Sequence, residues 1–469
     1  QKHSLQWADC MTDGDLTLGR EDGREDTWNL PDVEVLFWFC GLDILQSKVS
    51  LALESQEYIT ALYQHKVCRV GYVCAVRHLE ACEAAETPSA KEERASRERS
   101  LSCGRAVLKA LEVLPWVQAS PGIKRVVLVL DAFDLAGAGY PLELIQSCVR
   151  SMYKEAHVSI VLRFIADTDA CWVPERVLAD VHMVWVPSAH SAAALPTNLL
   201  PRTVVIPEIC QAPECRPPSA PIGSAPFVFL AVMNDYGLDD QLRPDQPGPQ
   251  RWNAARKNLA ALLKAFFFEF PGGRLDSGRP PALGEPQVEL CVKSTRPGLH
   301  ADIDAFLALH GLEGKVCIVD RWLENIGEFL QLGHCVVAPS RGEGWCRPLA
   351  EALLAGYPVI GSSFGGHTDF LDCGTGYPVA TSICECPYML GRQWGYGRWG
   401  EVDLADLRRA MRLVVSDYDE ALSRAARGRQ LISKKCSASA VASAIGQLIL
   451  RPLVFDQVAR NEEIFELVD

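Results

Sequence analysis

Short runs of hydrophobic residues alternate along this chain with longer stretches in which apolar and polar positions recur at helical spacing. The first set of runs lies at 33–39, 68–76, 125–131, 157–165, 182–187 and 203–207. Amphipathic stretches such as 45–65 and 141–155 lie between them. Continuous apolar strands separated by helices are typical of a parallel sheet that helices cover on both faces. We therefore predict an α/β domain over residues 33–207.

The alternation stops at 208–226, EICQAPECRPPSAPIGSAP, a Pro- and Ser-rich stretch typical of a linker. It restarts with expected strands at 227–233, 287–293, 315–320, 335–340 and 357–363. We therefore predict a second doubly wound domain over 227–440. A polar segment, 1–32, precedes the two domains, and a helical tail, 441–469, could pack back on the first. Doubly wound sheets bind ligands at the carboxyl ends of their strands, which places the site in the cleft between the domains.

Composition narrows the class of protein. The chain has 469 residues, 48% of them hydrophobic, which is too long for one ordinary core. A net charge of −13 argues against nucleic acid or an anionic membrane as the main partner. No apolar run approaches the roughly 20 residues of a transmembrane helix.

Cysteine usage and the N-terminus bear on localisation. The 18 cysteines are scattered through apolar runs, which favours reduced core thiols and a cytoplasmic protein. The polar, acidic N-terminus has no signal-peptide pattern. The chain begins with Gln rather than Met, which leaves a targeting segment upstream open.

The stretch SRGEGWCRPLAE at 340–351 is the first candidate for chemistry. Glu343 falls in the loop after an expected strand, and Glu351 lies one turn inside the helix that Pro348 begins. Gly342 and Gly344 permit close approach of the backbone. A helix N-terminus at the edge of a sheet can bind an anion. The spacing equally fits an ordinary loop followed by a helix whose dipole favours Glu351.

Two further stretches favour a site over an ordinary loop. The turn Gly365–Gly366 follows the next expected strand and should reach the same edge of the sheet. Arg251, Arg256 and Lys257 lie before or at the start of an expected helix, where cations oppose the helix dipole. A bound anion such as a diphosphate would explain them, and a solvated basic turn is the alternative.

The segment PSRGEGWCRPLAEALLAGYPVIGSSFGGHTDFL resembles the signature of retaining GT-B glycosyltransferases of the GT4 type. Glu343 and Glu351 match the E-x7-E element of that family. RKNLAALLKAF resembles its donor-phosphate segment, and VHMVWVPSAHSAAAL and QWGYGRWGEVDLADLRRAMR resemble other stretches. These matches cover most of residues 157–425. The resemblance implies the GT-B fold, in which two Rossmann-like domains face each other across a cleft.

The same resemblance implies a hexosyltransferase that transfers a sugar, with retention, from a nucleotide sugar to a hydroxyl of a glycan, lipid or small molecule. Lys257 and Arg256 would hold the diphosphate, with help from Arg251. Glu343 would contact the donor sugar, and Glu351 the ribose hydroxyls. We take Glu343 and Lys257 as catalytic, because stabilising the leaving diphosphate is the main task. Further donor contacts would come from Gly344, Trp345, Gly365 and Gly366.

The resemblance implies no cofactor or required metal besides the donor itself. The donor would be a sugar linked to GDP or UDP, and mannose is slightly favoured as the sugar. On the acceptor side the candidates are Gly41, Asp169 and His190. Asp167-Thr-Asp169 also resembles the DxD metal element of another glycosyltransferase fold, which would make the enzyme Mn- or Mg-dependent. His334 stands where the family commonly has Asp.

The first half lacks the family's glycine-rich loop. This departure leaves open a catalytically silent scaffold that binds nucleotides or sugars.

Overall fold

The computed structural model describes residues 35–40, 69–74, 125–132, 157–221, 225–233, 256–273, 287–295, 298–321, 325–386 and 397–450, with isolated positions within 55–65 and at 142 and 323. Gly41 and Arg251 lie outside the described residues, as do the segment 1–32 and the end of the tail, 451–469.

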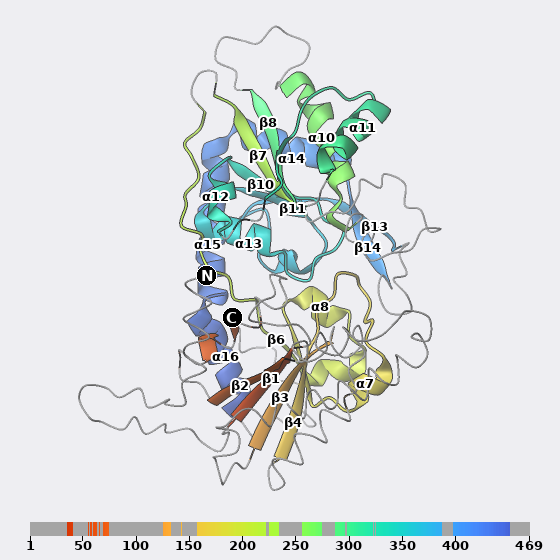
Figure 1. Cartoon of the computed structure of the whole chain (residues 1–469), viewed down its shortest axis with the longest axis vertical. Coiled ribbons are helices and arrows are strands. Elements are labelled where there is room, and N and C mark those ends of the chain that lie inside the picture. Colours follow the sequence, from red (N-terminus) through yellow and green to blue (C-terminus); the bar gives the residue numbers. More distant parts are fainter. Residues whose placement is uncertain are drawn as a thin grey trace, which may run out of the picture.

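Two parallel sheets form the frame of the molecule (Figure 1). The first contains β1 (Val35–Cys40), β2 (Arg69–Cys74), β3 (Arg125–Asp131), β4 (His157–Arg163), β5 (Met183–Val186) and β6 (Thr203–Val205). The second contains β7 (Phe227–Val232), β8 (Val288–Lys293), β9 (Cys317–Val319), β10 (Cys335–Ala338), β11 (Val359–Ser362) and β12 (Tyr377–Val379). The strand orders are β2-β1-β3-β4-β5-β6 and β12-β11-β10-β7-β8-β9. Both orders reverse at an inner strand, as doubly wound sheets do, and the second reverses between β7 and β10.

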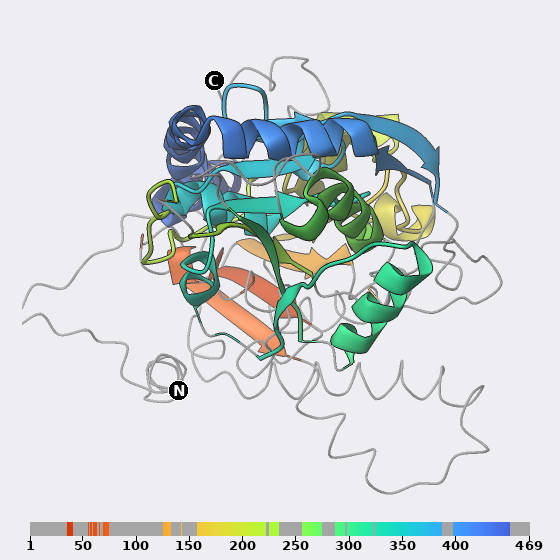
Figure 2. The ribbon, with the colours of Figure 1, turned by 90° about the horizontal axis from the view of Figure 1, so that it is seen from above.

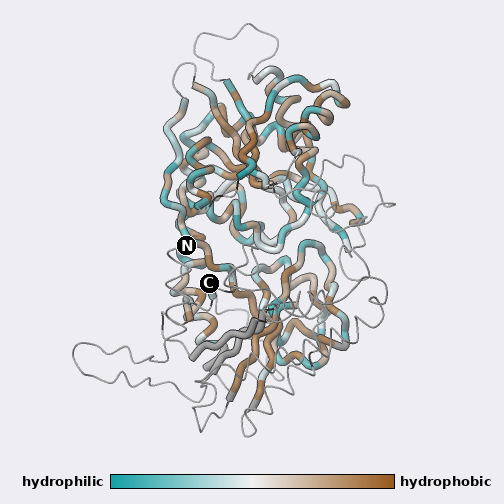
Figure 3. The backbone as a smooth tube through the Cα atoms, viewed as in Figure 1, coloured by the Kyte–Doolittle hydropathy of each residue, from teal (hydrophilic) through white to brown (hydrophobic). Residues whose placement is uncertain are grey.

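The central strands are buried because helices cover the second sheet on both faces. Every residue of β10 and of β11 is buried. One face packs against α10 (Leu259–Glu269), α11 (Leu299–Leu309) and α14 (Leu404–Ser416). The other face packs against α12 (Gly327–Leu330), α13 (Arg347–Ala355) and part of α15 (Tyr418–Lys435). Figure 2 looks down on this half, with α14 beside α10, and Figure 3 shows the hydrophobic strands at its centre.

The first half places two short helices near its sheet edge. These are α7 (Glu175–Ala179) and α8 (Ala189–Ala193), and α8 directly follows β5. Residues 206–221, which lead to the second half, carry no helix or strand. Figure 1 draws α16 (Ala438–Leu450) at the level of the first sheet. None of the helices that the structure describes has both the length and the hydrophobicity to span a bilayer.

The strands that the hydrophobic runs predict are present, with small shifts at their ends. The pattern misses β12 and the antiparallel hairpin of β13 (Thr381–Glu385) and β14 (Arg398–Val402). β13 has no hydrophobic run because all of its residues are exposed or half-buried. This hairpin contributes to the site described next.

Candidate active site

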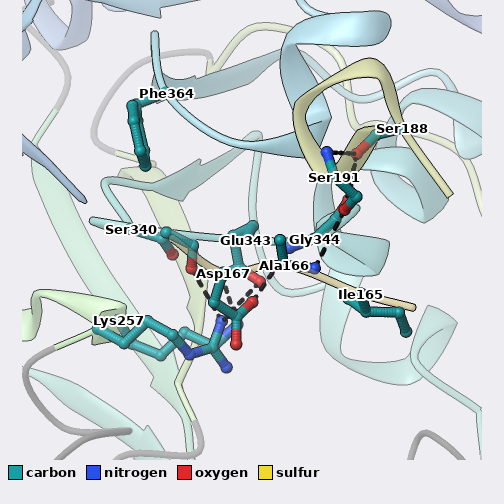
Figure 4. A network of polar contacts seen from close by, with 12 residues as sticks. Ile165, Ala166, Asp167, Ser188, Ser191, Lys257, Ser340, Glu343, Gly344 and Phe364 are labelled. Carbon is teal, nitrogen blue, oxygen red and sulfur yellow. Dashed lines mark hydrogen bonds and ion pairs between the residues drawn. The ribbon is translucent and has the colours of Figure 1, made fainter. Parts of the chain in front are cut away.

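The loop between β10 and α13 carries Glu343 at the point where the second sheet reverses its strand order. Glu343 is 6% exposed, and its carboxylate lies among charged groups (Figure 4). Lys257 Nζ lies 2.5 Å from Oε1, and Arg256 Nη1 lies 3.0 Å from Oε2. The hydroxyl of Ser340 also hydrogen-bonds to this carboxylate. The structure therefore brings together Glu343, Lys257 and Arg256, as the sequence predicts.

The two cations precede α10, and the backbone fixes their position. Arg341 donates its backbone N–H to the carbonyl of Arg256 at 2.7 Å. Asn258 adopts a left-handed conformation with φ of 58°, which turns the chain into the helix. Burial acts to raise the pKa of Glu343, but Lys257 and Arg256 hold it down at about 2. Glu343 is therefore ionised at neutral pH and is a hydrogen-bond acceptor rather than an acid.

A carboxylate from the first half completes this cluster. Asp167 follows β4, and its Oδ1 accepts the backbone N–H of Gly344 at 3.1 Å and lies 3.4 Å from Arg256 Nη1. Burial raises the pKa of Asp167, and Arg256 acts in the opposite direction. The sequence suggests Asp167 only as part of a metal-binding element. Its position at the carboxyl end of β4 is the sequence feature that could have placed it in the site, because that edge of the sheet faces a cleft in such folds.

The glycines of these loops are required by close packing. A Cβ on Gly342 would lie 1.8 Å from the carbonyl oxygen of Asp167, and one on Gly366 would lie 1.8 Å from that of Gly344. Gly366 donates its N–H to the carbonyl of Glu343 at 2.6 Å, next to Gly365 with φ of 114°. The second glycine turn thus meets the Glu343 loop, as expected for loops that follow neighbouring strands.

Further contacts join this loop to the first half. Ser188, at the start of α8, donates its hydroxyl to the carbonyl of Gly344 at 2.8 Å. Asp369 accepts the backbone N–H of Ala189 at 2.8 Å. The junction between the two halves therefore passes through the same loops that carry the candidate residues.

The two carboxylates of the Asp-Thr-Asp element bind different arginines. Asp169 accepts the backbone N–H and the Nε–H of Arg398 in β14, both at 2.7 Å, whereas Asp167 faces Arg256. In the described ranges no three or more His, Cys, Asp and Glu side chains are grouped to hold a metal ion. In the described residues, the Asp-Thr-Asp element therefore joins the first half of the molecule to the second.

His190 lies on α8 beside these carboxylates. Its ring centroid is 4.8 Å from that of Phe364, which follows β11 in the second half. Its Nε2 forms no hydrogen bond with any residue that the structure describes. Burial lowers the pKa of His190, and Asp167 and Asp169 oppose the change. A neutral imidazole therefore faces the junction from the first half.

Glu351 lies one turn inside α13, as predicted, and its partner is Arg347. Arg347 Nη2 lies 3.2 Å from Glu351 Oε1. Burial raises the pKa of Glu351, and Arg347 opposes the change. Arg347 carries the same kind of sequence signal as Lys257, a cation near the start of a helix, where it opposes the helix dipole.

Two tryptophans and one histidine near the matched sequence motifs have side chains that contact other protein groups. Trp345 is 4% exposed and its ring packs on that of Phe370, so we expect only its backbone to be available to the site. Trp399 is fully buried, with the guanidinium of Arg341 5.6 Å from its ring centroid. His334 accepts the backbone N–H of Val228 at the amino end of β10, away from the site.

The depressed pKa of Glu343 predicts a pH-dependent stability. The ionised carboxylate stabilises the fold above its ordinary pKa of 4.5, and this contribution is lost as the pH falls toward 2. Glu343→Gln should therefore cost about 3 kcal/mol at pH 7 and progressively less below pH 4.5. Urea unfolding of both proteins between pH 7 and pH 3.5 measures this. A cost that does not change with pH would contradict it, and Glu328→Gln, on the surface, should cost little throughout.

Comparisons with known proteins bear on the fold and on the enzyme class. Residues 281–384 match the sequence model of the family described as glycosyl transferases group 1. Sucrose-phosphate synthase from Thermosynechococcus elongatus has a similar structure, with a TM-score of 0.55, 14% identity, and coverage of 88% of this chain and 98% of that chain. A glycosyltransferase from Rickettsia africae aligns with a TM-score of 0.55 at 11% identity, covering 92% and 100% of the two chains.

A third similar structure is that of the Anabaena protein HepE in complex with UDP. It aligns with a TM-score of 0.50 at 13% identity, covering 89% of this chain and 99% of that chain. A comparison with curated protein sequences gives no match. Identities this low show the fold alone, and the family match supplies the enzyme class. Together they identify the chain as a glycosyltransferase of the GT-B fold whose second domain carries the group 1 sequence pattern.

Proposed function

We propose that this enzyme binds a nucleoside diphosphate sugar at the Glu343 loop and transfers the sugar, with retention, to a hydroxyl acceptor. The observation that carries the proposal is the buried cluster of Glu343, Lys257 and Arg256 at the carboxyl end of β10. A sugar diphosphate is anionic at one end and rich in hydroxyls at the other. The cations can bind the anionic end, and the ionised carboxylate beside them can accept hydrogen bonds from the hydroxyls.

Each charged group of the cluster has a role in this proposal. Lys257 and Arg256 bind the diphosphate, and Arg251 adds a further contact from just upstream. Asp167 now accepts hydrogen bonds from Arg256 and from the N–H of Gly344. A diphosphate that bound these donors would displace Asp167. Glu343 would then accept hydrogen bonds from sugar hydroxyls, and Glu351 from those of the ribose.

The catalytic contribution is electrostatic in this proposal. Charge develops on the leaving diphosphate as the glycosidic bond breaks, and Lys257 and Arg256 stabilise that charge. Glu343 does not serve as the general acid, because its pKa of about 2 keeps it ionised. Backbone groups of Gly344, Trp345, Gly365 and Gly366 complete the donor contacts. The acceptor approaches from the first half, near Asp169 and His190.

We also propose that the enzyme is of the GT4 type, because of the E-x7-E element at Glu343 and Glu351. UDP is supported as the nucleotide by the ligand named for the Anabaena structure, and GDP-mannose by the family resemblance alone. A cytoplasmic location rests on cysteine usage, and each cysteine whose side chain the structure describes is free.

Hydrolysis of the donor tests retention without a known acceptor. Incubated with UDP-glucose or GDP-mannose, both α-linked, the enzyme should release the free sugar first as its α anomer. Proton NMR during the first minutes, before mutarotation, detects it. Release of the β anomer would contradict retention. Tight nucleotide binding without turnover with water or any acceptor would favour the silent scaffold, and loss of activity in EDTA would favour a metal-dependent enzyme.

A further inference from the structure

Arg347, the first residue of α13, joins the two halves of the molecule. Its guanidinium binds Glu57 of the first half in a fork, with Nη1 at 2.7 Å from Oε2 and Nη2 at 3.1 Å from Oε1. The same guanidinium donates to Glu351, from Nη2 at 3.2 Å and from Nε at 3.3 Å. The side chains of Arg347, Glu57 and Glu351 are 20%, 18% and 19% exposed. A cation here opposes the helix dipole, so these two carboxylates account for its position.

The charge of this cluster suits hydroxyl groups rather than phosphate. Glu57 and Glu351 bind the single guanidinium of Arg347, and the charge of the buried Glu208 also acts on it. Three carboxylates around one cation repel an anionic ligand and accept hydrogen bonds from neutral hydroxyls. The diphosphate groups therefore belong with Lys257 and Arg256, and a hydroxyl-bearing part of the donor belongs here.

The hydrogen bonds also leave one oxygen of Glu351 available. Both donations from Arg347 go to Oε1, and within the described part of the chain Oε2 accepts no hydrogen bond. Arg347 thus fixes the orientation of the carboxylate without using its second oxygen. A guanidinium fork held by Glu57 restricts this orientation more than a flexible ammonium would.

We propose that Arg347, held by Glu57 from the first half, is a positioning residue that orients Glu351 so that Oε2 accepts a hydrogen bond from a ribose hydroxyl of the nucleotide. This inference rests on the proposed function. Because Glu57 and Glu351 lie in different halves, the ribose contact is complete only when the halves are together. Nucleotide binding and domain closure therefore favour each other.

Calorimetric titration with UDP and with 2′,3′-dideoxy-UDP tests this assignment, and GDP and its dideoxy analogue serve in the same way. The wild-type enzyme should bind the ribonucleotide at least about 10-fold more tightly, because hydrogen bonds to a charged carboxylate are strong. Arg347→Met should abolish this preference and bind the dideoxy analogue with wild-type affinity. A residue that only stabilised the fold would weaken both nucleotides equally.

Matched variants keep the test informative. Glu57→Gln should reduce the preference, and Arg347→Lys should restore only part of it, so either replaces Arg347→Met if that variant does not fold. Arg408→Met, which removes an ion pair with Glu269 on another helix, should keep the full preference.

The outcomes separate the two claims. If the wild-type enzyme binds no nucleoside diphosphate, the proposed function fails and this inference with it. If it binds both analogues equally, or if Arg347→Met keeps the preference, the inference alone is overturned.

Discussion

Lys257→Met should reduce release of the nucleoside diphosphate from its sugar by about 100- to 1000-fold, the effect of removing one group that stabilises developing charge. Lys257 Nζ lies 2.5 Å from Glu343, at the position where the leaving diphosphate is expected. Methionine keeps the length of the side chain and removes its charge. The measurement is the steady-state rate of UDP or GDP release, with the thermal unfolding temperature recorded for each variant.

The control for this prediction lies on the following helix. Lys264 is a residue of α10, and its ammonium lies 5.9 Å from the ring centroid of Phe306, among residues not assigned to the site. Lys264→Met should keep the wild-type rate. Comparable rates for Lys257→Met and the wild-type enzyme would remove Lys257 from the mechanism.

Gly342→Ala should lower activity by about 100-fold, the scale expected when catalytic groups are displaced by about 1 Å. The added Cβ would lie 1.8 Å from the carbonyl oxygen of Asp167, which belongs to the backbone of the opposite half. Because a backbone oxygen cannot rotate away, the Glu343 loop or the whole half has to move. The donor affinity should fall together with the rate, since the cations move relative to Glu343.

Gly344→Ala is the matched comparison for this prediction. Its Cβ would meet Ile165 Cγ2 at 2.1 Å, a side-chain atom that can move by a change of rotamer. We expect a smaller loss of activity than for Gly342→Ala. Steady-state kinetics and small-angle scattering of both variants measure the loss and any opening of the halves. Wild-type kinetics for Gly342→Ala would show that this contact does not matter for catalysis.

Much of the fold follows from local pattern. Buried strands such as β10 and β11 are continuous apolar runs, and such runs are visible without knowledge of what they pack against. The hydrophobic pattern does not predict β13 because all of its residues are exposed or half-buried, and its partner β14 lies beyond the intervening segment 387–396. Local hydrophobicity carries no signal for such a hairpin.

The candidate site also has one part that the sequence predicts and one part that it does not. Glu343 and Lys257 could be placed together because both lie at carboxyl ends or helix starts of one doubly wound sheet. The contacts from the first half could not be predicted. Asp167 and Gly344 are 177 positions apart, and Glu57 and Arg347 are 290 apart. These pairs depend on how the two halves meet, which no periodicity along the chain records.

A crystal structure with UDP or GDP bound would locate the diphosphate. We expect the β-phosphate within hydrogen-bond distance of Lys257 Nζ and Arg256, with Asp167 withdrawn from Arg256 and from the N–H of Gly344. A nucleotide bound elsewhere, with the Glu343–Lys257 and Asp167–Arg256 pairs intact, would contradict it.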